Sequence, residues 1–182
     1  HRDSAAPHLG HVPAHWRLTR LRFVASFNPT KSELGAVSPD TEFSFLPMEA
    51  IGEDGSLRLD TVRPLRDVEQ GYTFFRDGDL VIAKITPCFE NGKGALARGL
   101  VGGAAFGTTE LIVVRPRPGE VAGQFLNWLF ASSVFRAPAT AAMYGAGGQK
   151  RVPDAFVRDF IIALPTLPEQ RLIAAFLDRE CG

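Results

Sequence analysis

The sequence predicts an α+β protein, in which helices flank a twisted, mostly antiparallel β-sheet and a further helix begins near the C-terminus. Short apolar runs bounded by glycine, proline and asparagine fill the middle of the chain and are typical of strands. Apolar residues at helical spacing follow residue 119, and a helix-capping pattern opens the last segment. With 182 residues, 45% of them hydrophobic, the chain is long enough to form one globular domain without disulfides or metal.

Residues 1–15 are expected to form an extended N-terminal segment. They hold all four histidines, three of which have a spacing suited to a helical metal site: His8, His11 and His15. Gly10 and Pro13 argue against a continuous helix there, so we expect no bound metal. Instead, we expect the segment to end where Trp16 packs against the main domain, residues 16–165.

The main domain begins with the apolar residues between 18 and 27, which predict a short strand and one helical turn. Asp77-Gly78 is a strong turn signal, and the apolar run after it is typical of a buried strand. The strands are expected at residues 43–47, 80–85, 95–100, 104–106, 111–114 and 160–164. Glycine-marked turns between most of them favour antiparallel pairing.

Helices are expected in the last third of the chain. Residues 125–135 place their apolar side chains on one face, and residues 152–157 predict a short helix. In residues 166–182, Thr166 and Glu169 form a capping-box pattern, with Pro168 in the first turn. The apolar stripe behind this cap consists of Leu172, Ile173, Phe176 and Leu177. Because so short a helix is marginal alone, we interpret it as the start of a longer one.

Motifs of catalysis are missing from the sequence. It has no phosphate-binding P-loop, no Gly-x-Ser-x-Gly turn and no close cysteine pair. Asp77, Asp79 and Lys84 have some likeness to a nuclease strand, but Ile82 stands where that motif needs an acid. Cys88 is interpreted as a small packed side chain. The two cysteines and the absence of a long apolar run predict a protein of the reducing cytoplasm.

Charge is unevenly distributed although basic and acidic residues balance at twenty each. Acidic residues dominate positions 31–60, whereas basic residues dominate 84–117 and 145–158. Two polar, glycine-containing loops lie in the basic stretches, at 84–93 and 145–151. Lysine and arginine suit phosphates and guanine edges, and glutamine or asparagine suits adenine. The loops are therefore candidate DNA contacts, the alternative being ordinary solvated hairpin loops.

The candidate DNA-binding residues form two groups. Those in the two loops are Lys84, Thr86, Asn91, Lys93, Gln149, Lys150 and Arg151. A second group lies in the turn-rich stretch after the strand expected at residues 43–47 and consists of Arg58, Arg63 and Arg66. Residues that read bases are alternatively expected in the stretches Ser56–Arg66 or Ala139–Tyr144.

Six segments, in register along residues 8–180, resemble the specificity subunits of type I restriction-modification systems. The segments are Gly10–Trp16, Phe45–Met48, Gly78–Lys93, Phe106–Glu110, Gly145–Val152 and Leu164–Gln170. The resemblance implies a target-recognition domain that reads one half of a split double-stranded DNA sequence and catalyses nothing. It implies no cofactor in this chain.

The same resemblance implies partners. Specificity subunits join two recognition domains through coiled-coil helices, and residues 166–182 resemble the start of such a helix. Methyltransferase subunits, which carry S-adenosylmethionine, bind that scaffold for DNA methylation, and a motor-nuclease subunit carries ATP. Leu172, Ile173, Phe176 and Leu177 are thus implied as partner-binding residues. One recognition domain with almost no coiled coil departs from the family pattern, and fits a trimmed piece, a natural truncation or a half-subunit that pairs with another copy.

Two alternatives to an independent DNA reader stay open. The first is a protein-interaction module that docks a methyltransferase and has little DNA affinity when isolated, which the neutral sequence pI of about 7.1 favours. The second is the recognition part of a fused restriction enzyme. The length of the parent gene beyond residue 182 distinguishes these alternatives.

Overall fold

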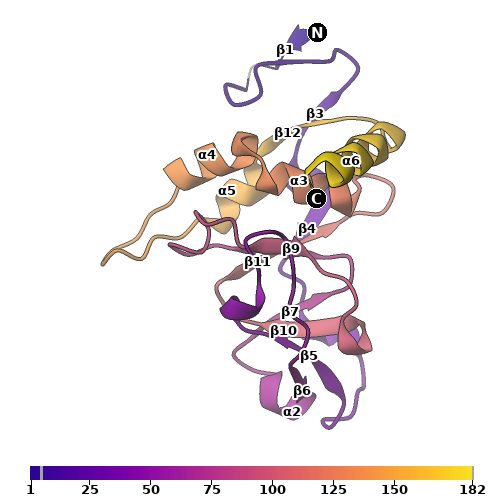
Figure 1. Ribbon diagram of the computed structural model, residues 1–182, viewed down its shortest axis with the longest axis vertical. Coiled ribbons are helices and arrows are strands. Elements are labelled where there is room, and N and C mark those ends of the chain that lie inside the picture. Colours follow the sequence, from indigo (N-terminus) through magenta and orange to yellow (C-terminus); the bar gives the residue numbers. More distant parts are fainter. Residues whose placement is uncertain (5, 182) are drawn as a thin grey trace. The chain divides into compact units, whose positions relative to one another are not determined.

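A computed structural model describes residues 1–4 and 6–181 and divides the chain into two compact units (Figure 1). Unit 1 comprises His1–Ser26 and Pro116–Gly182, and unit 2 comprises Phe27–Arg115. Unit 2 is thus inserted in the sequence of unit 1. This division follows other boundaries than the expected ones at residues 15/16 and 165/166. Ala5 and Gly182, which fall within the expected end segments, lie outside the described residues.

Unit 2 is built on two four-stranded sheets. The strands are β4 (Ala25–Phe27), β5 (Glu42–Leu46), β6 (Val62–Pro64), β7 (Thr73–Arg76), β8 (Leu80–Ala83), β9 (Gly94–Leu96), β10 (Ala104–Gly107) and β11 (Leu111–Pro116). Their orders are β6-β5-β10-β7 and β4-β11-β8-β9. β10 runs parallel to β5, whereas β5–β6, β7–β10, β8–β9 and β8–β11 are antiparallel. The chain enters and leaves unit 2 within β4 and β11.

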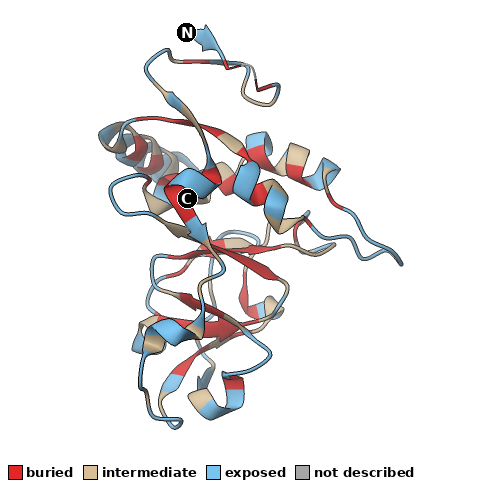
Figure 2. Cartoon of the chain, turned by 180° about the vertical axis from the view of Figure 1, so that it is seen from behind, coloured by how far each residue is buried: buried red, intermediate tan, exposed pale blue. Residues whose placement is uncertain are grey.

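Alternating side chains of β7 and β10 are buried on both faces of their sheet. Phe75 and Ala105 belong to a core cluster that also holds Val81 and Val113 of the other sheet. Phe74 and Phe106 point into a second cluster with Phe43 and Val68. Because successive residues of a strand face opposite sides, one run of apolar residues supplies both clusters. Figure 2 shows these strands as largely buried.

Short helical turns complete unit 2. They are η1 (Lys31–Leu34), η2 (Met48–Ala50), α2 (Leu65–Val68) and η3 (Val101–Gly103). An ion network stands beside them: Asp79, only 1% exposed, accepts hydrogen bonds from Arg115 at 2.6 and 2.7 Å and from the Arg76 amide at 2.8 Å. Glu33 of η1 binds the same guanidinium at 2.6 Å. In the sequence motif that has some likeness to a nuclease strand, Asp79 therefore forms a structural ion pair with Arg115.

Unit 1 packs helices around a two-stranded ribbon. The ribbon pairs β3 (Arg17–Arg20) with β12 (Ile161–Leu164) in antiparallel register. The helices are α1 (Leu21–Val24), α3 (Gly123–Ala131), α4 (Ser133–Ala141), α5 (Asp154–Asp159) and α6 (Leu167–Cys181), and a small hairpin joins β1 (Arg2–Asp3) to β2 (His11–Val12). α3 packs against α4 and α6, and α1 packs against α5. Phe135 links these elements through ring contacts with Phe130 at 4.8 Å and Phe160 at 5.1 Å.

The expected α+β class with mostly antiparallel strands is confirmed, with differences in detail. The single expected sheet is divided into separate sheets, since the strands pair in two groups within unit 2. The helix expected over 125–135 is two helices, because Ser132 adopts an extended backbone with ψ 154°. The strand expected at 95–100 ends at Leu96, ahead of the turn at Gly99, where φ is +72°.

Candidate nucleic-acid interface

The loop at 84–93 follows β8 and is held by its own backbone. The amides of Phe89, Asn91 and Lys93 donate to the carbonyls of Ile85, Pro87 and Cys88 at 2.9, 3.0 and 3.0 Å. Phe89 is fully buried and anchors the loop, and the Thr86-Pro87 peptide bond is cis. These internal hydrogen bonds give the loop a defined backbone conformation, from which its polar side chains project.

The four candidate residues of this loop differ in their contacts. Lys93 Nζ donates to the Met48 carbonyl at 3.0 Å, so its side chain clamps the loop to η2. The Thr86 hydroxyl donates to Glu90 at 3.1 Å. Asn91 is exposed. Lys84 is half-buried, its amide donates to Glu110 at 2.9 Å, and its ammonium is directed toward a pocket. Lys84 and Asn91 are therefore the side chains of this group that are best placed for an outside ligand.

The loop at 145–151 belongs to unit 1 and is a hairpin closed by Tyr144 and Arg151, whose backbones exchange hydrogen bonds at 2.9 and 3.2 Å. Glycine is needed at its base: φ of Gly145 is +153°, and an added Cβ would lie 2.2 Å from the Gln149 carbonyl. The candidate side chains Gln149, Lys150 and Arg151 are exposed. These three consecutive residues lie together at the C-terminal side of the hairpin.

The second group of arginines is engaged with neighbouring side chains. Arg58 pairs with Asp60 at 3.4 Å, and Arg66 pairs with Asp40 and Asp67. The Arg63 guanidinium lies 5.4 Å from the centre of the Phe45 ring. All three arginines are exposed, so each of them can exchange its present partner for a phosphate.

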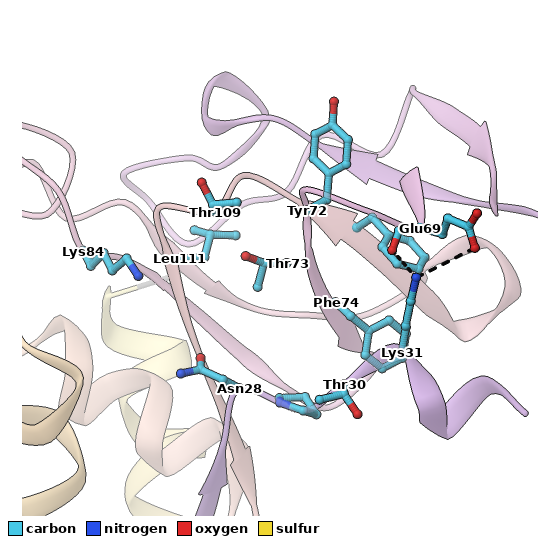
Figure 3. Close-up of a pocket in the computed structure, with 12 residues that line it drawn as sticks. Asn28, Thr30, Lys31, Glu69, Tyr72, Thr73, Phe74, Lys84, Thr109 and Leu111 are labelled. Carbon is cyan, nitrogen blue, oxygen red and sulfur yellow. Dashed lines mark hydrogen bonds and ion pairs between the residues drawn. The ribbon is translucent and has the colours of Figure 1, made fainter. Parts of the chain in front are cut away.

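Unit 2 contains a pocket with a volume of about 370 Å³ (Figure 3). Of the residues that line it, Lys84 alone was a candidate from the sequence. Lys84 and Lys31 lie on opposite sides of it, with Thr73 and Thr109 between them. Tyr72 stands at its rim. Thr109 belongs to one of the six resembling segments, but nothing in the sequence marks Tyr72. Because the lining comes from strands and loops far apart in sequence, periodicity could not reveal it.

Neighbouring side chains shift the pKa values of two charged residues, Arg115 and Glu169. The Arg115 side chain, hydrogen-bonded to Asp79, has a pKa raised above its ordinary value. In unit 1, the His15 imidazole beside Glu169 and the Thr166 hydroxyl lower the pKa of that carboxyl to about 2. Within residues 1–4 and 6–181, no three histidine, cysteine, aspartate or glutamate side chains come together as a metal site. His8, one of the three histidines at metal-like spacing, contacts the Ile161 carbonyl at 2.8 Å.

The expected partner-binding stripe lies on the outer side of α6. Leu172 is 71% exposed and Phe176 is 54% exposed, whereas Ile173 and Leu177 are half-buried. The side of α6 that packs on unit 1 carries instead the buried Gln170 and Ala174. The structure thus leaves much of the apolar stripe uncovered within the described chain.

Comparison with known proteins shows similarity to one class, the specificity subunits of type I restriction enzymes. The chain is homologous to one part of such subunits. It is 40% identical over 168 residues to the type I restriction enzyme EcoAI specificity subunit of Escherichia coli, and 37% identical over the same length to the EcoEI specificity subunit. Each match covers 91% of the chain but 28% of the relative. The resemblance seen in the motifs is therefore confirmed.

Solved structures share the fold. The HsdS subunit of Thermoanaerobacter tengcongensis superposes with a TM-score of 0.74 at 24% identity, over 92% of this chain and 42% of that one. A type I restriction-modification specificity subunit of M. genitalium gives a TM-score of 0.55 at 16% identity, over 95% and 41%. No family model matches the chain. None of the helices in the described residues is long and apolar enough to cross a membrane.

Proposed function

We propose that the chain is a target-recognition domain that reads one half of a bipartite double-stranded DNA sequence for a type I restriction-modification complex, and that it has no catalytic activity. The observation that carries this proposal is the 40% identity to a specificity subunit over 91% of the chain. The chain spans less than a third of the length of that relative, which fits one of two recognition domains.

The chemistry of the two loops supports DNA contact. Lys150 and Gln149 project from an exposed, glycine-based hairpin, and Lys84 and Asn91 from a loop with a fixed backbone. Cationic side chains supply phosphate contacts that fix position, and amide side chains supply paired donor and acceptor groups for base edges. Each loop thus combines the two kinds of contact that sequence recognition needs.

The partners proposed for this domain are a DNA methyltransferase subunit, a motor-nuclease subunit that acts indirectly, and a second recognition domain or second copy of the chain. S-adenosylmethionine and ATP would enter with those subunits, not with this chain. The exposed stripe of α6 with Leu172 and Phe176 supports helix-to-helix docking, because apolar side chains this exposed gain from burial against a partner. The proposed location is the cytoplasm.

A second candidate function is a docking module with little DNA affinity of its own. The observation that favours it is the same exposed stripe, together with side-chain ion pairs that engage Arg58 and Arg66. In this alternative the helix recruits the methyltransferase, and sequence reading requires the complete subunit.

The deciding experiment is selection of the purified chain on a randomised double-stranded DNA pool at two salt concentrations. Enrichment of a short motif supports a half-site reader and identifies its target. Weak binding without enrichment, strongly reduced by salt, means that recognition needs the partner domain or subunit. No binding at low salt rejects autonomous DNA reading and supports the docking module.

A further inference from the structure

We propose that the pocket of unit 2 holds one unpaired nucleotide of a DNA strand, with the base or sugar against its apolar floor and the phosphate at Lys84. The inference rests on the proposed DNA-binding function and adds a ligand site that neither the loops nor the relatives define. Its volume of about 370 Å³ is in the range of roughly 300–1,000 Å³ that is typical of small-ligand sites, and suits a single nucleotide rather than a helix.

The floor of the pocket is apolar and rigid. Phe74, Phe106 and Leu111 line it, and each is buried in the core of unit 2. Phe74 and Phe106 also contact each other, with ring centroids 5.5 Å apart. Because these side chains are fixed by the core, the floor needs little ordering when a ligand binds. Such a surface favours an apolar ring over a hydrated ion.

The two sides of the pocket differ in charge. On one side Lys31 is neutralised by Glu69, whose carbonyl and carboxylate both contact its ammonium. On the other side the Lys84 ammonium has no acidic or carbonyl partner within the described residues. Figure 3 shows the two lysines well separated, with the paired one far from Lys84. A negative group is therefore attracted to the Lys84 side, which fixes the orientation of the nucleotide.

The rim carries a held aromatic ring. Tyr72 is 43% exposed, yet Phe45 meets it edge-on at 5.1 Å with an interplanar angle of 86°. Phe45 itself packs under the Arg63 guanidinium. An exposed tyrosine of fixed position offers contact area at low entropic cost, and every base has a face that can stack on it. Thr73 and Thr109 add hydroxyls between the rim and Lys84 that can bond a base edge.

A DNA nucleotide is favoured over another small anion by continuity with the candidate interface. Lys84 both lines the pocket and begins the loop at 84–93, and its amide is bonded to Glu110, next to Thr109. A strand that crosses this loop thus passes the mouth of the pocket. A base within a duplex is stacked and paired, so only a displaced nucleotide can enter a recess.

The first test is titration of the whole chain with each of the four deoxynucleoside 5′-monophosphates, followed by NMR, with inorganic phosphate as the reference. We expect saturable shifts of the Thr73, Lys84 and Thr109 amides for at least one nucleotide and none for phosphate at equal concentration. Lys84→Ala and Tyr72→Leu should each weaken binding about tenfold. Arg98→Ala and Phe23→Leu are matched controls, because both residues are exposed and lie outside the pocket, and they should leave binding unchanged.

Absence of saturable nucleotide binding overturns the inference, as does binding that survives both pocket substitutions or is matched by phosphate. The second test compares a duplex that carries one unpaired nucleotide with the fully paired duplex, and tighter binding of the first, lost in Tyr72→Leu, supports the pocket. Failure of the proposed function gives a different result, since mononucleotides would still bind while the randomised pool shows no enrichment.

Discussion

Two lysines of the loop at 84–93 carry the same charge but make different contacts. Lys93 donates to the Met48 carbonyl at 3.0 Å, whereas the Lys84 ammonium faces the pocket. The sequence places both in the same basic loop, and it could not separate them because the acceptor for Lys93 lies 45 residues earlier. Residue type and loop membership were thus predictable, but side-chain partners were not.

The first prediction concerns Lys93. Lys93→Ala should lower the free energy of unfolding by about 1.5–3 kcal/mol, because it removes a charged hydrogen bond and leaves the Met48 carbonyl without that donor. Lys84→Ala, its matched control, should change it by less than about 0.5 kcal/mol. Urea denaturation measures both. Equal losses for the two variants would show that the clamp adds nothing to stability.

The second prediction concerns Lys150 in the exposed hairpin. If Lys150 contacts a phosphate, Lys150→Ala should weaken DNA binding and reduce the slope of log affinity against log salt by about 0.9. Arg98→Ala removes an exposed cation outside both candidate loops and should leave the slope unchanged. The measurement is a salt series of DNA titrations. An unchanged slope in Lys150→Ala removes this residue from the interface.

The third prediction concerns Asp79, whose carboxylate is buried against Arg115. Asp79→Ala should lower the free energy of unfolding by about 3–5 kcal/mol. The reason is that the partly buried Arg115 guanidinium loses its main partner and the Arg76 amide loses its acceptor. Asp60→Ala removes the exposed pair with Arg58 and an exposed hydrogen bond from the Thr61 hydroxyl, and it should lower the free energy of unfolding by less than about 1 kcal/mol. Chemical denaturation compares them. A similar small loss in both variants would refute a structural role for the buried pair.

Among the elements, α6 was predicted with its start, but the side chains that pack it against the rest of unit 1 were not. The capping pattern of Thr166 and Glu169 places the helix start at Leu167, where the structure has it. Its packing depends on Gln170, which is 1% exposed, accepts from the Ala122 amide at 2.8 Å and donates to the Pro165 carbonyl at 2.9 Å. A polar side chain therefore fixes the inner face, while Leu172 and Phe176 of the apolar stripe are exposed. Hydrophobic pattern alone would suggest the reverse.

The fourth prediction is a pH dependence at the start of α6. His15 and Thr166 lower the pKa of Glu169 from 4.5 to about 2, so the contact stabilises the folded chain above pH 4.5. The contribution is lost as the pH falls from 4.5 through about 2. Thermal unfolding of the wild type and Glu169→Gln should therefore differ at pH 6 and converge near pH 2. A constant difference across this range would contradict the assignment, and added salt should reduce the difference because the group is exposed.

For the whole molecule, the positions of most strands along the sequence were predictable, but their pairing into sheets was not. The apolar runs locate β5, β8, β10 and β11, but β10 pairs in parallel with β5, which lies some sixty residues earlier. β6 and β7 were not predicted, because neither is a continuous apolar run: β6 contains Arg63 and Pro64, and β7 begins with Thr73 and ends with Arg76. The pocket was unpredictable for the same reason, because its lining depends on which strands become neighbours.

The fifth prediction concerns cleavage of the exposed hairpin at 145–151 in unit 1. Trypsin should cleave early at Lys150 or Arg151, in the exposed hairpin. The two fragments should stay together under native conditions, because β12 pairs with β3 and α6 packs on α3 across the cut. Denaturing gels and size-exclusion chromatography test this together, with Lys150→Ala/Arg151→Ala as the resistant control. Separation of the fragments on the column would show that these contacts do not hold unit 1 together.

The two ends of unit 2 lie side by side. Asn28, at its start, accepts from the Val113 amide at 3.0 Å through its side chain and donates its own amide to the Val113 carbonyl at 2.9 Å. Unit 2 is also one uninterrupted stretch of the sequence, Phe27–Arg115, so a replacement whose own ends lie equally close can be joined at the same two points. Recombination can therefore replace it in a single exchange, while the ribbon of β3 and β12 and the helix α6 stay as they are. New sequence preferences could arise by such exchanges without redesign of the α6 stripe that we propose as the partner-binding surface.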